Sequence, residues 1–110
     1  MRAISFTTAD KYRKNAKWHN DIAIEILKIR LNCIIDATSK EHVHRRGNTT
    51  IYQFGSCLLF VKGNIISDIR WTGRDEMALP VEQKRLTALF VRNGLHYRGY
   101  KYADETIRMS

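Results

Sequence analysis

The chain has 110 residues, which suits one domain and is too short for two ordinary ones. Hydrophobic residues make up 44% and aromatic residues 10% of it, which excludes a disordered composition and predicts one buried core. Nineteen Lys and Arg against 11 Asp and Glu leave a formal net charge of +8. Such a charge attracts nucleic-acid phosphates or acidic protein surfaces, and a basic surface that serves only solubility is the alternative.

The first elements are a strand and a basic segment. Residues 2–7 alternate apolar and polar side chains, which predicts a short strand. Residues 8–18 are polar and basic, and Thr8 or Asp10 is available there as a helix cap.

The next segment has two patterns at once. Its apolar residues over 21–36 fit the period of a helix and also the alternation of a strand. Sixteen such residues exceed a typical strand, so we predict a helix from about His19 to Ile35. Residues 37–48 are predicted to form a polar loop.

Three β-rich runs follow, Thr49–Phe54, Cys57–Lys62 and Ile65–Trp71. They are separated by Gly55-Ser56 and Gly63-Asn64, and a two-residue connection that begins with Gly suits a type II′ turn. The pattern predicts a three-stranded antiparallel meander.

The middle run is apolar on both faces. Cys57, Leu59 and Val61 lie on one face of the predicted strand. Leu58 and Phe60 lie on the other. Both faces are therefore expected to be covered, either by helices on both sides or by a second subunit in a homodimer.

A second helix is predicted between Pro80 and the pair Asn93-Gly94, because Pro suits a helix start and Gly a helix end. His96 to Tyr102 alternates and predicts a last strand. The expected fold is a single α+β domain over residues 1–110, with the order β-α-β-β-β-α-β and the meander packed with two helices.

The two cysteines, Cys33 and Cys57, lie in apolar stretches and are predicted to be buried free thiols. The N-terminal segment lacks the apolar run of a signal peptide, and charges interrupt every apolar segment. We therefore expect a cytoplasmic protein that does not cross a membrane.

No cofactor or metal site is predicted. Cys33, Cys57, His42 and His44 are zinc ligand types, but the paired short spacings of a zinc site are missing. No Gly-rich phosphate loop and no acidic metal cluster appears.

Two groups of basic and aromatic residues are candidate nucleic-acid contacts. The first group comprises Lys11, Arg13, Lys14 and Lys17, with Tyr12 and Trp18 among them. The second group comprises Arg92, Tyr97, Arg98, Tyr100, Lys101 and Tyr102, in which Tyr100 and Tyr102 are the candidates for base stacking. The alternative is a solvated helix face for the first group and a sheet edge for the second, with the aromatic rings in the core.

A third candidate is the basic segment that contains His42, His44, Arg45 and Arg46. A His is a suitable general acid or base for RNA cleavage, and an Arg can stabilise charge that develops on phosphorus. His42, His44 and Arg46 would form the centre of a metal-independent ribonuclease. The alternative is a basic loop without chemistry, with Arg45 and Arg46 as phosphate contacts.

Three functions are therefore carried forward. The leading hypothesis is a non-enzymatic nucleic-acid-binding module. The second is a protein-interaction module, an inhibitor or adaptor that docks on an acidic protein, and the third is the ribonuclease. A short basic chain of this kind is loosely similar to small ribonuclease toxins and equally to small regulatory proteins that phages and plasmids encode.

Overall fold

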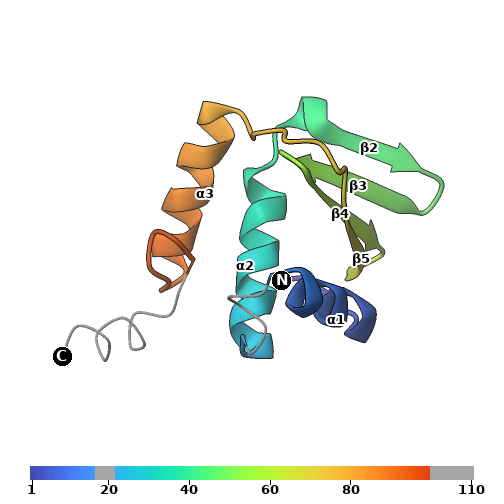
Figure 1. The fold of residues 1–110 in the computed structure, drawn as a ribbon, viewed down its shortest axis with the longest axis horizontal. Coiled ribbons are helices and arrows are strands. Elements are labelled where there is room, and N and C mark those ends of the chain that lie inside the picture. Colours follow the sequence, from blue (N-terminus) through green and yellow to red (C-terminus); the bar gives the residue numbers. More distant parts are fainter. Residues whose placement is uncertain (17–21, 100–110) are drawn as a thin grey trace.

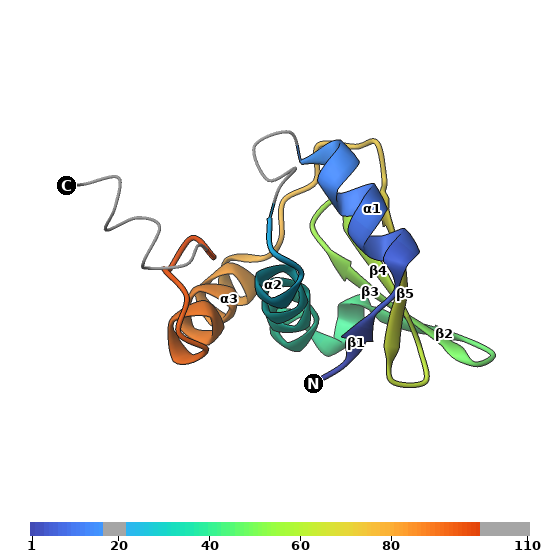
Figure 2. The ribbon, with the colours of Figure 1, turned by 90° about the horizontal axis from the view of Figure 1, so that it is seen from below.

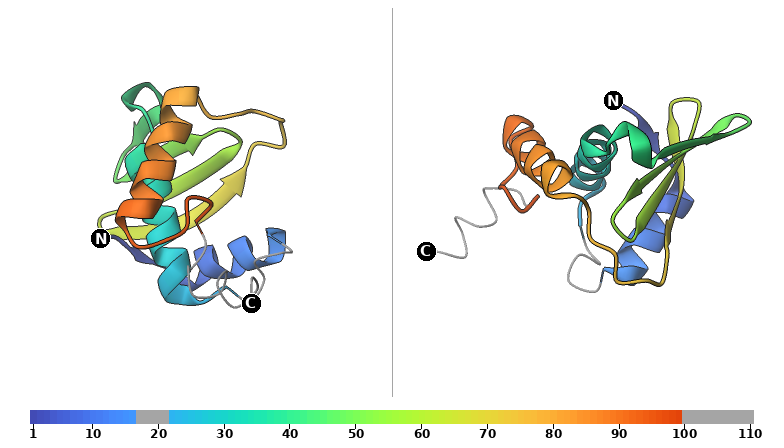
Figure 3. Two further views of the ribbon diagram at one scale, coloured as in Figure 1. Left: turned by 90° about the vertical axis from the view of Figure 1, so that its left-hand side faces the viewer. Right: turned by 90° about the horizontal axis from the view of Figure 1, so that it is seen from above.

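Three layers make up the part of the chain that this computed structural model describes, residues 1–16 and 22–99. They are a sheet, the helix α2 (Ile24–Ala37) against it, and the helix α3 (Pro80–Arg92) against α2 (Figures 1 and 2). Figure 3 shows α3 in front of α2 with the sheet behind both. The arrangement is the predicted α+β class, and no helix of the described residues is long and apolar enough for a membrane crossing.

Helix α2 is buried on two sides. Leu27 and Leu31 are fully buried in the core cluster that α2 forms with the sheet. Cys33 belongs to a second cluster with Phe90 of α3 and Leu95 beyond it. A helix that is covered on both sides needs apolar residues all round, which is why this segment also matches the alternation of a strand. The helix itself is confirmed, although it begins at Ile24 and ends at Ala37. Residues 19–21 of the predicted span lie outside the described residues.

The sheet has five strands in the order β1-β5-β4-β3-β2. The strands are β1 (Ala3–Ile4), β2 (Val43–Arg46), β3 (Thr49–Phe54), β4 (Cys57–Lys62) and β5 (Ile65–Trp71). Strand β1 is parallel to β5, and every other pair is antiparallel. The predicted meander is confirmed, and β3, β4 and β5 have the predicted bounds.

The predicted loop over residues 37–48 is wrong, because it contains a short helix, η2 (Lys40–His42), and strand β2. Gly47 joins β2 to β3 with a φ of +59°, close to the values of the two predicted turns at Gly55 (+59°) and Gly63 (+61°). No described residue other than Gly has a positive φ, so each turn has the φ pattern of type II′. Strand β2 has the sequence VHRR, in which apolar and polar residues do not alternate. It is ordered as a strand by its hydrogen-bonded pairing with β3.

The predicted strand over residues 2–7 is too long. It ends at Ile4, and Ser5 caps the helix α1 (Phe6–Asn15) by accepting a hydrogen bond from the Thr8 backbone N–H at 3.1 Å. The cap is therefore Ser5, and neither Thr8 nor Asp10 has that position. The Thr8 hydroxyl instead donates to the carbonyl oxygen of Ile66 at 2.9 Å, which holds α1 along the β5 edge of the sheet (Figure 1).

The predicted C-terminal helix is confirmed, and the described part of the predicted strand, residues 96–99, is not a strand. Pro80 is the first residue of α3, and the helix ends at Arg92, before Gly94. Over residues 96–99 the chain forms turns and no strand, and residues 100–102 lie outside the described residues. The reason is burial: Leu95 is 2% exposed and packs against the α2–α3 layer, which turns the chain away from the sheet.

Asn32 connects α2 to the first strand. Its side chain is buried, its Oδ1 accepts from the Arg2 backbone N–H at 3.0 Å, and its Nδ2 donates to the Arg2 carbonyl oxygen at 2.9 Å. One amide side chain thus pairs with both backbone groups of a residue next to β1.

We expect Asn32→Ala to lower the free energy of unfolding by about 1–3 kcal/mol, because it leaves partly buried backbone groups without partners. The measurement is urea unfolding followed by circular dichroism. The matched control is Asn15→Ala, because Asn15 is exposed and bonds only within its own helix, and its expected effect is within about 0.5 kcal/mol. Equal effects of the two substitutions would contradict the role of Asn32.

Candidate nucleic-acid interface

The sheet has one covered face and one open face. Leu59 and Val61 of β4, with Ile66 and Ile69 of β5, are at most 5% exposed in the core beneath the helices. Alternation along the strands places the other set of side chains on the opposite side, and none of those is buried. We call this side the outer face; it comprises His44, Arg46, Thr49, Ile51, Gln53, Leu58, Phe60, Lys62, Ile65, Asp68 and Arg70. The alternative in which helices cover both faces is therefore wrong for the described residues, and coverage of the outer face by a second subunit stays a prediction.

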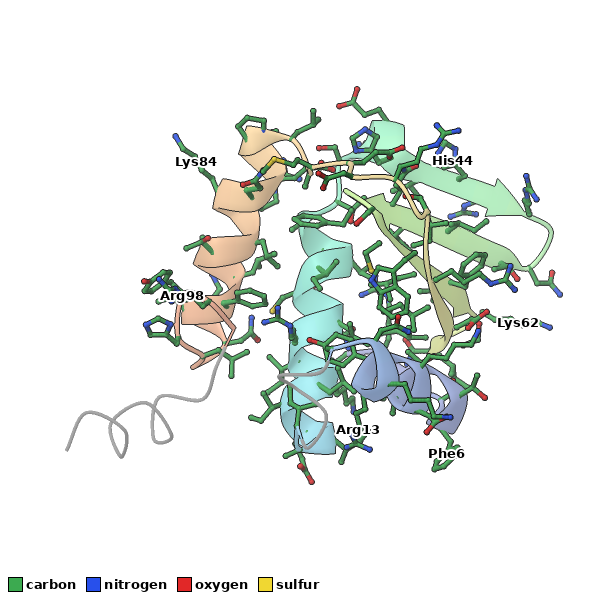
Figure 4. The ribbon with its side chains drawn as sticks, in the orientation of Figure 1. Phe6, Arg13, His44, Lys62, Lys84 and Arg98 are labelled. Atoms are coloured by element: carbon green, nitrogen blue, oxygen red, sulfur yellow. The ribbon has the colours of Figure 1, made fainter. Side chains whose placement is uncertain are left out.

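Register places the outer-face residues in rows across the sheet. Arg46 of β2 pairs with Thr49, which pairs with Lys62 of β4. In the next row, Ile51 and Phe60 follow His44 of β2. Neighbours within a row lie about 4.8 Å apart, and the two rows lie about 6.6 Å apart along the strands. The apolar centre therefore borders the basic rim. Figure 4 shows His44 and Lys62 on the sheet side of the molecule, with Lys84 of α3 beyond α2.

The basic side chains of the rim are available for a ligand. His44, Arg46 and Lys62 are exposed and have no hydrogen bond or ion pair to any side chain within residues 1–16 and 22–99. Arg45 points to the other side of β2 and is also exposed, because the β2–β3 hairpin extends away from the helices (Figure 1). Four basic side chains thus gather around one end of the sheet.

The one carboxylate on the strands of the outer face, Asp68, is neutralised by two cations. Its Oδ1 lies 2.6 Å from Lys11 Nζ, and its Oδ2 lies 3.0 Å from Arg70 Nε. Burial by itself would raise the pKa of Asp68, but the hydrogen bonds from Lys11, Arg70 and the Ile69 backbone N–H outweigh it and hold this pKa below its usual range. Asp68 therefore stays ionised and fixes Arg70, whose Cζ lies 5.0 Å from the centre of the Phe60 ring.

Within the first group of candidates, the described side chains contact other parts of the protein. Lys11 binds Asp68, Arg13 donates to a backbone carbonyl before α2 at 2.8 Å, and Lys14 forms an ion pair within α1 at 2.9 Å. Tyr12 is 7% exposed and belongs to the core, as the alternative interpretation predicted. Lys17 lies outside the described residues.

The described part of the second group lies far from the outer face. Arg98 lies beside α3 in Figure 4, and its guanidinium Cζ is 5.4 Å from the centre of the Tyr97 ring. Tyr100, Lys101 and Tyr102 lie outside the described residues. The fold thus does not bring Arg98 to the cations of the outer face.

The residues of the ribonuclease hypothesis do not converge. His42 is directed at Glu82 of α3, with 2.9 Å between Nδ1 and Oε2. His44 and Arg46 lie on the outer face and Arg45 on the opposite side of β2. The sequence-adjacent cluster is therefore divided between an internal contact and two sides of a strand.

Glu82 is a buried residue that sequence reasoning missed. It is 0% exposed, and its carboxylate accepts hydrogen bonds from the backbone N–H groups of Ser39 (2.8 Å) and Leu79 (2.9 Å). The bond from Leu79 caps α3, and a Glu three residues after the cap position was the sequence signal that marks it. Through Ser39 and His42, Glu82 also holds the segment that leads into β2.

The pKa of Glu82 is set by opposing effects. Burial alone would raise it, but the hydrogen bonds from Ser39, His42 and Leu79 outweigh burial and hold the pKa below the usual value for a glutamate. The unfolded chain therefore takes up the proton first as the pH falls. The stabilisation is complete above the pKa of an unfolded glutamate, about 4.3, and is lost as the pH falls through the lower folded value.

We expect Glu82→Gln to lower the free energy of unfolding by about 1–3 kcal/mol at neutral pH, because an amide cannot accept all of these bonds. The difference from the wild type should shrink as the pH falls below about 4.3. Urea unfolding at a series of pH values measures both effects. Glu41→Gln is the control, because Glu41 is exposed. If the difference in unfolding free energy between Glu82→Gln and the wild type does not change with pH, the stabilising role of the Glu82 carboxylate is contradicted.

Cysteine and metal chemistry have no support in the described residues. Burial raises the pKa of the Cys33 thiol to about 11 and that of Cys57 to about 12, so both are protonated at neutral pH. Both cysteines are free, as predicted; Cys33 is buried, whereas Cys57, predicted to be buried, is half-buried. No group of three or more His, Cys, Asp or Glu side chains in residues 1–16 and 22–99 is placed to hold a metal ion.

No protein-family model, no curated protein and no solved structure matches this chain. The outer face is therefore described by its own chemistry. It combines His44 and the two cations Arg46 and Lys62, which have no side-chain partner among the described residues, with a partly exposed aromatic ring and one carboxylate that two cations neutralise.

Proposed function

We propose that the protein is a non-enzymatic module that binds nucleic acid on the outer face through the phosphate backbone. The observation that carries this proposal is the basic rim of His44, Arg46 and Lys62, which has no internal partner among the described residues and borders an apolar centre. Arg45 adds a further cation at the hairpin, on the opposite side of the same strand.

Unpaired cations suit phosphate better than paired ones. A lysine such as Lys11 must give up its carboxylate partner before it can bind phosphate, whereas Lys62 has none among the described residues to lose. Each phosphate that is neutralised releases condensed counterions, so affinity falls with salt by a slope of about 0.7 per contact on single strands and 0.9 on duplex DNA. The net charge of +8 adds long-range attraction.

A protein partner is the second candidate, because Ile51, Leu58 and Phe60 expose apolar surface between the cations. An acidic protein would match the rim. Pairing of two copies along the free edge of β2 is disfavoured, because that strand is short and carries His44, Arg45 and Arg46.

The proposal predicts that Lys62→Glu weakens binding and lowers the salt slope by about 0.7–0.9, since one phosphate contact is lost. The matched control is Lys84→Glu, an identical change of charge at an exposed position on α3, whose slope should equal that of the wild type. The measurement is fluorescence anisotropy with labelled single-stranded and double-stranded DNA and RNA over a range of salt concentrations.

Absence of binding at low salt, or an affinity that does not change with salt, would contradict the proposal and favour an acidic protein partner. Equal effects of the two substitutions would place the attraction in the overall charge and not in the outer face. The same samples are run on a gel. Shortened RNA would favour the ribonuclease, and His44→Ala should then lose cleavage while it keeps the fold.

A further inference from the structure

Phe60 stands at the centre of the outer face. Its backbone pairs with Ile51 on one side and Asp68 on the other, and its ring is partly exposed. The Arg70 guanidinium lies over this ring, with 5.0 Å from Cζ to the ring centre. Asp68 holds Arg70 through Nε, and Lys11 holds Asp68 in turn. The aromatic ring and the guanidinium plane are therefore positioned before any ligand arrives.

Such a pair suits an unpaired base. Bases of single strands stack on aromatic rings and on guanidinium planes, whereas the bases of a duplex are stacked on one another inside the helix. A strand that lies across the sheet can set a base on Phe60 and Arg70 while its phosphates reach Arg46 and Lys62 in the adjacent row. A duplex lying on the same face meets the cations and leaves Phe60 without a partner.

We propose that the ligand of the outer face is single-stranded nucleic acid, with at least one base stacked on the Phe60–Arg70 pair. This inference rests on the proposed function and names its substrate class.

The same face predicts little discrimination between bases. Gln53 is the side-chain amide of the outer face, and its Nε2 already donates to Glu76 Oε2 at 2.9 Å. Asp68 is occupied by Lys11 and Arg70. With these two groups engaged, the contacts that Phe60, Arg70 and Lys62 provide are stacking and phosphate binding, which every base and every nucleotide offer.

The experiment compares three labelled ligands: a thymidine strand, an abasic strand with the same number of phosphates, and a duplex. The wild-type protein should bind the thymidine strand about five- to a hundredfold more tightly than the abasic strand for each stacked base, and more tightly than the duplex. Phe60→Leu should remove most of the preference for thymidine over abasic strands and leave abasic binding unchanged. Phe6→Leu is the matched control, because Phe6 is 86% exposed on α1, and it should behave as the wild type.

Arg70→Lys is a second variant, which keeps the charge and removes the guanidinium plane; it should lower thymidine affinity more than abasic affinity. Circular dichroism and urea unfolding verify that each variant is folded. Equal affinity of the wild type for thymidine and abasic strands, or for strand and duplex, would overturn the single-strand inference and leave phosphate binding intact. Failure to bind any of the three ligands would instead overturn the proposed function itself.

Discussion

The burial of α2 on two sides is the constraint from which the rest of this structure follows. Leu27 and Leu31 fill one face of the sheet, and the opposite side of the helix carries the cluster around Cys33 and Phe90. Because α3 packs on α2 and α1 lies along the β5 edge, no described helix is left to cover the second face of the sheet. The apolar residues of that face, Phe60 among them, therefore border solvent and stand beside cations.

The basic residues of this chain have two different uses. Arg2, Lys11 and Arg13 hold strands and helices together through carboxylates or backbone carbonyls, whereas Arg46 and Lys62 have no such contacts within the described residues. Arg46 and Lys62 can therefore bind an anion without the loss of an internal interaction among the described residues. The net charge of +8 does not distinguish cations with internal partners from cations without them. The positions of their partners in the fold do.

Local signals predicted much of the fold, and the site only in part. Gly55-Ser56 and Gly63-Asn64 defined the bounds of the meander, and Pro80 defined the start of α3, because turn and cap chemistry acts between neighbouring residues. Strand β2 was missed because it is ordered by pairing with β3 and has no apolar pattern of its own. His44, Arg45 and Arg46 were recognised as a basic cluster. Phe60, Lys62 and Arg70 were missed. Both faces of the middle strand are apolar in sequence, so the sequence does not reveal which face is exposed to solvent.

By itself, the sequence determined the α+β class, the three-stranded meander, the α3 boundaries and the excess of positive charge. Each of these depends on composition or on residues within one turn of one another. The tertiary structure decided which apolar face of β4 is covered and which cations are paired, because both depend on contacts between distant segments. Lys11 and Asp68 are 57 residues apart, and their ion pair removes one cation from the predicted patch while it fixes Arg70 over Phe60.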